Sequence, residues 1–337
     1  MKPLLAQRLA AQALTKPVRS VLEVAQRLGA LQAQDFTQVQ WALGVRCEGA
    51  TVDAVERAFA ERQIVRTWAM RGTLHVVPAE DVSWLVALCA KRNLARAGRR
   101  LRELQIGSAD VAAARTVLEK VLRGQKMKRD EVFFHLEGAG HGVKNQRGVH
   151  LLWHLAQEGV VCLAGEHFVL LDEWVPLPRR LEGDEALGEL AARYFRGHGP
   201  ASLEDLAFWS GLSKGEAKRA QEIAGPAREP DVAGLPEALL LPGFDEYFLG
   251  YAERSPCLDP QHFERVVPGG NGVFLATVVL RGQIQGTWRR RVTRARVTIT
   301  VAPFATPTSA QMRAIERAAV GYGTFLGKPV EVAFSDV

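Results

Sequence analysis

The segment QIVRTWAMRGTLHV, residues 63–76, decides the fold that we expect for this chain. Apolar and polar side chains alternate through IVRTW, and a second extended run, TLHV, begins after Arg71-Gly72. Alternation with period two, interrupted by a glycine turn, is typical of a β-hairpin. The segment therefore predicts two short strands joined by a tight turn at Arg71-Gly72.

Helical patterns lie ahead of this hairpin. A first helix is expected over residues 3–14, and a second begins after Ser20, where Glu23 completes a capping box. Two shorter helices follow, one ending near Gly44 and one starting at Thr51. Several helices followed by a strand–turn–strand wing predict a winged helix-turn-helix.

Two glutamines, Gln32 and Gln34, stand where the second helix is expected to end. In an unbroken helix their side chains would point about 200° apart. They converge only if the helix ends between them, and Asp35 and Phe36 are consistent with such an ending. Converged carboxamides have no titratable proton, but they can position a water molecule or stabilise positive charge on a sugar. The alternative is an ordinary pair of polar residues at the surface end of a helix.

The same order of elements recurs after a long helix that opens at Pro78. A second unit has three helices and two strands around a Gly165-Glu166 turn, and a third unit has three helices over residues 184–225. The third helix of the second unit is expected to act as a recognition helix. Its leading residues are of the kind that a helix N-terminus presents to phosphates or base edges, namely Lys144, Asn145, Gln146 and Arg147.

From about residue 236 the sequence becomes β-branched, aromatic and punctuated by glycine and proline, with a final helix expected over 308–326 and a strand over 329–334. The fold class that we predict is α+β, with three tandem winged helix-turn-helix units and a C-terminal β-rich unit. The expected domain boundaries are 1–104, 105–180, 181–235 and 236–337.

The formal net charge is +6, which favours a polyanionic partner. Basic residues gather in two blocks, 91–102 and 281–296. A solvated helix face explains the first block equally well, whereas arginines on short strands, as in the second, would repel one another without an anionic partner. No apolar run is long enough for a transmembrane helix. We expect a cytoplasmic protein associated with the nucleoid, with no membrane partner.

The four cysteines are widely separated, so neither a zinc site nor a disulfide framework is predicted, and buried thiols are expected. His150 and His154 stand four residues apart, but Leu151 occupies the position where a zincin helix has glutamate. We therefore predict no metal and no cofactor.

Four segments resemble the bacterial winged-helix DNA glycosylases of the AlkZ/YcaQ type. They span nearly the whole chain: LQAQ at 31–34, RTWAMRGTLHVV at 66–77, LLPGFDEYFLGYAERS at 240–255 and VPGGNGVFLATVVLRGQIQGTWRR at 267–290. The resemblance implies a C-shaped clamp around duplex DNA. It also implies excision of N7-alkylated purines and, in some members, unhooking of interstrand crosslinks.

The catalytic motif of that family is Gln-aliphatic-Gln in one branch and Gln-aliphatic-Asp in the other. Gln32-Ala33-Gln34 is similar to the first, AlkZ-like branch, which implies that Gln32 and Gln34 are catalytic. We therefore predict a monofunctional DNA glycosylase that uses water, is a monomer and acts on double-stranded DNA carrying alkylated purines.

Further site residues are expected around the hairpin and the basic strand. Arg71 and His75 are predicted to form a wall of the site, although a buried core position explains His75 equally well. Arg289, Arg290 and Arg291 are predicted to contact phosphates. Asp245 and Glu246 are expected to make structural contacts with arginines, because a carboxylate facing DNA phosphate would be repelled.

Two other function classes are consistent with the same elements. Winged helices also serve non-catalytic DNA-binding proteins such as transcriptional regulators, which would show sequence-dependent rather than lesion-dependent affinity. A winged-helix module that binds only protein would lack the steep salt dependence of DNA binding.

Overall fold

The computed structural model describes residues 2–227 and 229–335. The N-terminal part contains four helices: α1 (Lys2–Ala11), α2 (Val21–Leu28), α3 (Phe36–Gly44) and α4 (Val52–Ala60). Ser20 caps α2 as predicted, its hydroxyl accepting a hydrogen bond of 3.1 Å from the Glu23 N–H. Strands β2 (Ile64–Trp68) and β3 (Leu74–Pro78) confirm the hairpin, joined by a short helical turn, η1 (Met70–Gly72).

The chain around the glutamines differs from the prediction. Helix α2 ends at Leu28, because Gly29 adopts a left-handed conformation with φ of 77°. Leu31–Gln32 then forms a two-residue strand, β1, that pairs antiparallel with β3. The prediction that a helix runs into the glutamines is therefore wrong, and the motif is extended.

The second unit follows a long helix, α5 (Val82–Glu103), that starts after a turn, η2 (Ala79–Asp81). Its elements are α6 (Ser108–Val121), α7 (Arg129–Gly138), α8 (Arg147–Gln157), β4 (Val161–Ala164), β5 (His167–Leu170) and α9 (Leu171–Trp174). The two wings join through β2 and β4 into one sheet with the order β1-β3-β2-β4-β5. The hairpin therefore lies at the centre of a sheet that both units share.

The third unit consists of α10 (Gly183–His198), α11 (Leu203–Ser210) and α12 (Lys214–Ala224). The expected wing is absent from the described residues of 181–235. These helices pack against the shared sheet and α5, where Trp209 and Leu190 join Val65 and Val77 in one buried cluster. The described part of this unit has no wing of its own, and its apolar face is covered by the wing of the first unit.

The C-terminal unit contains a second sheet with the order β10-β9-β8-β7-β6, which confirms the β-rich prediction. Its strands are β6 (Ala238–Leu241), β7 (Thr277–Leu280), β8 (Gln283–Val292), β9 (Val297–Pro303) and β10 (Val330–Phe334). Its helices and helical turns are α13 (Glu246–Leu249), η3 (Pro260–His262), α14 (Phe263–Val266), η4 (Pro268–Gly270) and α15 (Ser309–Leu326).

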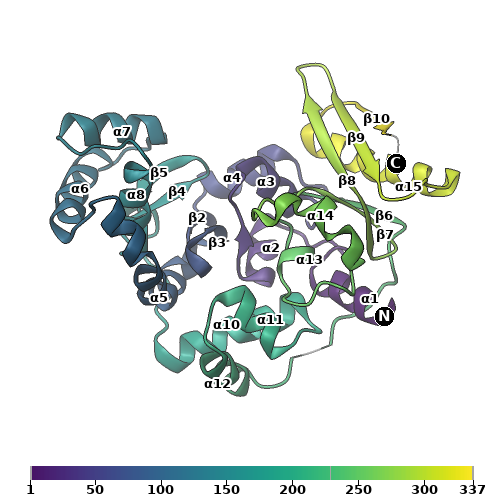
Figure 1. Ribbon diagram of the computed structural model, residues 1–337, viewed down its shortest axis with the longest axis horizontal. Coiled ribbons are helices and arrows are strands. Elements are labelled where there is room, and N and C mark those ends of the chain that lie inside the picture. Colours follow the sequence, from purple (N-terminus) through teal and green to yellow (C-terminus); the bar gives the residue numbers. More distant parts are fainter. Residues whose placement is uncertain (1, 228, 336–337) are drawn as a thin grey trace.

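The units form an open C (Figure 1). The second unit is one arm, the projecting β8–β9 hairpin is the other, and α2–α4 with the β2–β3 hairpin lie between them. No helix among residues 2–227 and 229–335 is long and apolar enough to span a membrane.

A buried ion pair ties the first unit to the C-terminal unit. Arg46, after α3, donates two hydrogen bonds of 2.8 Å to the Asp245 carboxylate. Its other three N–H groups donate to the Gln12 backbone, the Gln12 side chain and the Ala42 carbonyl, so all five donors are used. The predicted structural contact of Asp245 with an arginine is confirmed.

Asp245→Ala should destabilise the protein by roughly 3–5 kcal/mol, because it leaves the buried Arg46 charge without a counterion. The free energy of unfolding from urea titration measures the effect. Glu331→Ala, which removes an exposed partner of Arg296, is the matched control and should change stability little. Equal, small effects of the two substitutions would contradict a structural role for the buried pair.

Candidate active site

Strand β1 holds the glutamine motif at the edge of the shared sheet. Gln32 lies directly opposite His75 of β3, and the Ala33 N–H donates a hydrogen bond of 2.7 Å to the Leu74 carbonyl. Opposite residues of an antiparallel pair project their side chains to one face. The wing strand and the motif are thus neighbours, as expected for His75.

The two carboxamides have different partners. Gln34 is exposed, and its carboxamide oxygen accepts a hydrogen bond of 3.1 Å from the Leu74 N–H. Gln32 is half-buried, and its oxygen accepts a longer hydrogen bond of 3.4 Å from Arg71. No hydrogen bond between the two glutamines is found in the described part of the chain. Each side chain is oriented by the hairpin rather than by the other glutamine.

Arg66 of β2 binds the backbone of the glutamine motif. Its guanidinium donates hydrogen bonds of 2.8 Å to the Ala33 carbonyl and 3.4 Å to the Gln34 carbonyl. The Phe36 ring lies 5.6 Å from the same guanidinium. Sequence reasoning missed this role, although an arginine at a buried strand position needs acceptors and was a usable signal.

His75 is fully buried, so both interpretations of this residue are partly correct: it is a core residue and it lies beside Gln32. Its Nδ1 is 2.8 Å from the Thr73 carbonyl, which makes Nδ1 the protonated nitrogen, while the buried Nε2 has no hydrogen-bond partner among the residues that the structure describes. Burial, reinforced by the charge of Arg71, lowers the pKa of His75 to about 4. The imidazole is therefore neutral at physiological pH.

Arg71 sits at the tip of the hairpin in a left-handed conformation, with φ of 55°. Besides Gln32, its guanidinium donates to the Phe208 carbonyl of α11 at 3.4 Å and lies 5.8 Å from the Phe208 ring. Arg254 approaches that ring to 5.1 Å. The hairpin tip thus brings the first and third units together beside the motif.

Glu246 lies behind the motif and is only 2% exposed. One carboxylate oxygen accepts a hydrogen bond of 3.0 Å from the Gln32 N–H. The other oxygen accepts a hydrogen bond of 2.9 Å from the Trp209 indole N–H and lies 3.3 Å from His198 Nε2. The prediction of a contact with arginine is wrong for Glu246, because its neighbours come from α11 and α10.

Burial alone would raise the pKa of Glu246, but the hydrogen bond and charge of His198 and the Gln32 N–H outweigh it, and the pKa is lowered. A charged carboxylate is therefore fixed under the backbone of the motif. Because Glu246 and Gln32 are 214 residues apart, no local pattern signals their contact.

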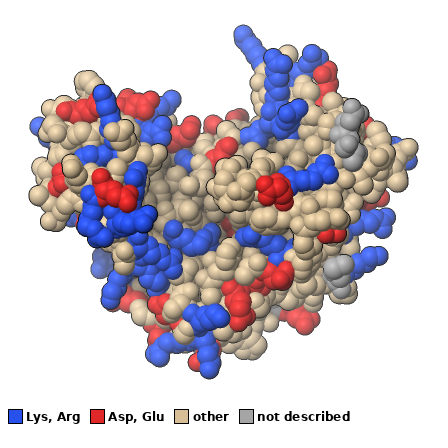
Figure 2. All heavy atoms as spheres, in the orientation of Figure 1, with Lys and Arg blue, Asp and Glu red and all other residues tan. Residues whose placement is uncertain are grey.

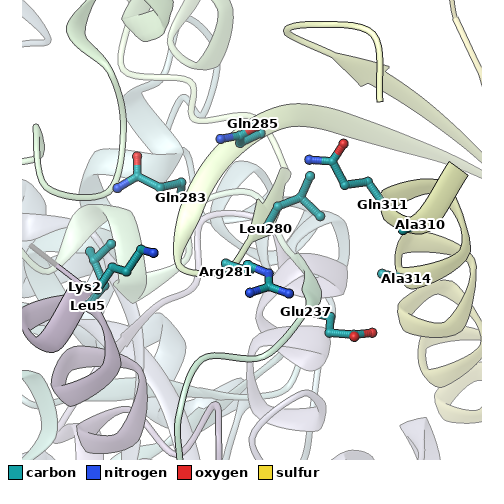
Figure 3. Close-up of a pocket in the computed structure, with 10 residues that line it drawn as sticks. All are labelled: Lys2, Leu5, Glu237, Leu280, Arg281, Gln283, Gln285, Ala310, Gln311 and Ala314. Carbon is teal, nitrogen blue, oxygen red and sulfur yellow. The ribbon is translucent and has the colours of Figure 1, made fainter. Parts of the chain in front are cut away.

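The glutamine motif borders a cavity of 510 Å³ that Gln34, Arg66 and Trp68 help to line. A separate cavity of 290 Å³ lies between α1, the β7–β8 turn and α15, where Arg281 and Gln311 face it (Figure 3). None of the site residues predicted from the sequence lines the second cavity. Two cavities thus border predicted site residues: the one at Gln34 and another of 390 Å³ that Arg71 helps to line.

The residues predicted to lead a recognition helix lie ahead of α8. Lys144, Asn145 and Gln146 are exposed, and Asn145 and Gln146 have positive φ, so the helix starts only at Arg147. The Arg147 guanidinium donates to the Leu104 and Gln105 carbonyls and to Asp110, the last at 2.5 Å. These hydrogen bonds join α8 to the α5–α6 connection, so the Arg147 guanidinium is bound to the protein itself.

The three arginines of β8 divide between its two faces. Arg289 and Arg291 are exposed on the projecting hairpin, whereas Arg290 donates a hydrogen bond of 2.5 Å to Thr37 of α3. Figure 2 shows Lys and Arg side chains on this hairpin and in the lower part of the opposite arm, so basic groups lie on both sides of the hollow. This distribution suits a polyanion between the arms.

All four cysteines are buried free thiols, as predicted. Within residues 2–227 and 229–335, no group of three or more His, Cys, Asp and Glu side chains is arranged to hold a metal ion.

Comparison with known proteins gives one consistent result. Residues 25–325 match the family described as DNA glycosylase AlkZ-like. The chain is 24% identical over 309 residues to the interstrand DNA cross-link repair glycosylase of Streptomyces sahachiroi, covering 80% of this chain and 82% of that protein. The structure is similar to that of Streptomyces sahachiroi DNA glycosylase AlkZ, with a TM-score of 0.78, 23% identity, and coverage of 98% of this chain and 99% of that one.

The buried neutral His75 predicts a specific pH dependence of stability. Its pKa is about 4 in the folded protein and 6.5 when unfolded, so below pH 6.5 the unfolded chain binds the extra proton. The free energy of unfolding should fall by about 2 kcal/mol between pH 7.5 and pH 5 from this residue alone. Urea titrations should show a shallower pH dependence for His75→Gln than for the natural protein. Gln125→Ala, which removes no titratable group, is the control and should keep the natural slope. Parallel curves for all three proteins would contradict the burial of a neutral His75.

Proposed function

The chain belongs to the AlkZ-like DNA glycosylases, and from this premise we propose that it hydrolyses the N-glycosidic bond of N7-alkylated purines in duplex DNA. The observation that supports the proposal most is the exposed carboxamide of Gln34, which is oriented by the β2–β3 hairpin that lies between the two arms (Figure 1). The site offers hydrogen bonding and charge: the described partners of the two carboxamides are the Leu74 N–H and the Arg71 guanidinium, and both are hydrogen-bond donors.

That chemistry fits a purine that is already cationic. Alkylation at N7 places positive charge on the imidazole ring, so the base departs without being protonated. The bond between N9 and C1′ breaks, and its electron pair neutralises the ring. Positive charge develops on the sugar, a water oxygen bonds to C1′, and the water proton passes to solvent. The protein needs only to orient the groups and stabilise the sugar cation.

Gln34 is the residue that we assign to this task. The Leu74 N–H uses one lone pair of its carboxamide oxygen, which leaves the second lone pair for the sugar cation or the attacking water. Gln32 orients Arg71, whose positive charge is suited to a flanking phosphate. Glu246 acts through the Gln32 peptide and keeps a negative charge below the reacting sugar.

The DNA backbone is proposed to cross the hollow between the arms. Arg289 and Arg291 on the β8–β9 hairpin and the exposed group Lys144, Asn145 and Gln146 are the proposed contacts to phosphate. Arg290 and Arg147 are proposed to support these contacts from within, because their guanidinium groups are bound to the protein.

Interstrand crosslinks are a second proposed lesion class. The relative from Streptomyces sahachiroi is named a cross-link repair glycosylase. A crosslink joined through purine N7 has the same cationic leaving group as an N7-methylpurine, so the same chemistry would release one strand from the other. A non-catalytic regulator is not supported, since the family consists of glycosylases.

Gln34→Ala should lower the single-turnover rate of 7-methylguanine release from duplex DNA by about 100-fold, because an orienting group is lost from the reacting centre. Affinity for the same DNA, measured by fluorescence anisotropy, should change little. Gln125→Ala, at an exposed position outside the cavity, is the matched control and should behave as the natural protein.

No base release by the natural protein from either an N7-methylguanine duplex or an N7-linked crosslink, with DNA binding intact, would contradict the proposed function. Equal losses of rate and affinity in Gln34→Ala would assign Gln34 to binding instead.

Glu246→Ala should also reduce the release rate by about 100-fold at unchanged DNA affinity, since the Gln32 peptide loses its anchor. The double variant Glu246→Gln, Trp209→Phe tests the charge separately. The amide oxygen introduced at position 246 still accepts a hydrogen bond from the Gln32 N–H. Trp209→Phe removes the indole N–H, which would otherwise face the NH₂ group of the introduced amide. A natural rate in the double variant would show that the hydrogen bond suffices, and a rate as low as that of Glu246→Ala would show that the negative charge is required.

A further inference from the structure

The turn between β2 and β3 is bound from outside the hairpin by side chains of α5 and α8. We infer that three of them, Asn93, Trp153 and Gln157, are positioning residues for the reaction. They hold the turn in the place from which the Leu74 N–H orients the Gln34 carboxamide. The inference rests on the proposed function and deepens it, because it makes a helix of the second unit part of the support of the site.

Trp153 and Asn93 donate hydrogen bonds to the turn itself. The Trp153 indole N–H donates a hydrogen bond of 3.0 Å to the Gly72 carbonyl, and the Asn93 amide donates one of 2.7 Å to the Ala69 carbonyl. The Trp153 ring also lies 3.4 Å from the position that a Cβ at Gly72 would take, so the ring and the turn are in direct contact. Ala69 precedes η1 and Gly72 ends it, so the turn is held at both ends.

Gln157 joins these contacts into a chain. Its carboxamide N–H donates a hydrogen bond of 2.7 Å to the Trp68 carbonyl at the end of β2, and its oxygen accepts one of 2.8 Å from Asn93. Asn93 and Gln157 are only 4% and 3% exposed. Burying a carboxamide costs free energy unless its polar groups are paired. The hydrogen bonds described for these two carboxamides lead only to each other and to the hairpin.

The turn needs such support because Arg71 adopts a left-handed conformation, with φ of 55°. A residue other than glycine rarely adopts this conformation, which persists where the surrounding structure enforces it. Within the turn, the Gly72 and Thr73 N–H groups donate hydrogen bonds of 3.1 and 3.2 Å to the Ala69 and Met70 carbonyls. The contacts from α5 and α8 add to this small internal set.

The held turn leads directly into the group that orients the motif. Leu74 follows the turn, lies opposite Trp68 in the hairpin, and donates its N–H to the Gln34 oxygen at 3.1 Å. A shift of the turn would therefore move this N–H relative to the carboxamide. Catalysis by orientation is sensitive to such shifts, since a misplacement of about 1 Å can cost about 100-fold in rate.

Two substitutions remove donors and keep apolar bulk at the same positions: Trp153→Phe and Gln157→Met. Trp41→Phe is the matched control, because its indole N–H also donates to a backbone carbonyl, that of Leu240, but in the contact of α3 with β6. Three quantities are measured for each protein. They are the single-turnover rate of 7-methylguanine release, the affinity for the same duplex, and the amide hydrogen exchange of residues 69–76 without DNA.

Trp153→Phe and Gln157→Met should each slow release by about tenfold at unchanged DNA affinity, and exchange over residues 69–76 should become faster. In a Gln34→Ala background the same substitutions should slow release by less than about threefold, because the group that they position is already absent. Trp41→Phe should match the natural protein in release rate, affinity and exchange.

Equal slowing in the natural and Gln34→Ala backgrounds would overturn the inference, because it would show that the substitutions act independently of Gln34. Equal losses of rate and affinity, a natural rate in both variants, or the same losses in Trp41→Phe would also overturn it. Natural exchange over residues 69–76 in both variants would overturn it without reference to activity. Release of no base by the natural protein would instead count against the proposed function, so the two failures are distinguishable.

Discussion

The hydrogen bond from the Gln32 N–H to the Glu246 carboxylate is the contact on which the site depends. It joins β1 of the first unit to α13 of the C-terminal unit, and Trp209 and His198 of the third unit hold the same carboxylate. A two-residue strand at a sheet edge has too few ladder bonds to be stable alone. A buried carboxylate is equally unstable without partners. Each therefore stabilises the other, and the motif is positioned by three units at once.

This arrangement explains why the proposed site is suited to a leaving group that is already cationic. The carboxamide of Gln34 contributes a lone pair, Glu246 a fixed negative charge, and His75 remains neutral because it is buried. These groups act by their fixed positions, which cost no reorganisation when positive charge develops. The rigid attachment of the motif to the sheet is thus part of the chemistry that we propose.

Local patterns in the sequence predicted the elements, and long-range contacts determined the site. The Ser20 cap, the β2–β3 hairpin and the second wing follow from spacing and turn residues, and the structure contains them. Strand β1 is too short to have a period, and its partner is more than forty residues away. The wing of the third unit was expected by analogy with the first two, whereas the structure covers α10–α12 with the wing of the first unit. Glu246 could not be assigned from sequence, since its partners lie on three distant elements.

The most direct measurement is a crystal structure of the protein bound to duplex DNA that carries 2′-fluoro-N7-methylguanosine, whose fluorine slows loss of the base by disfavouring a sugar cation. The account predicts that C1′ of the lesion contacts the Gln34 carboxamide and that the Glu246–Gln32 hydrogen bond is kept. A lesion whose sugar lies away from both glutamines would contradict it.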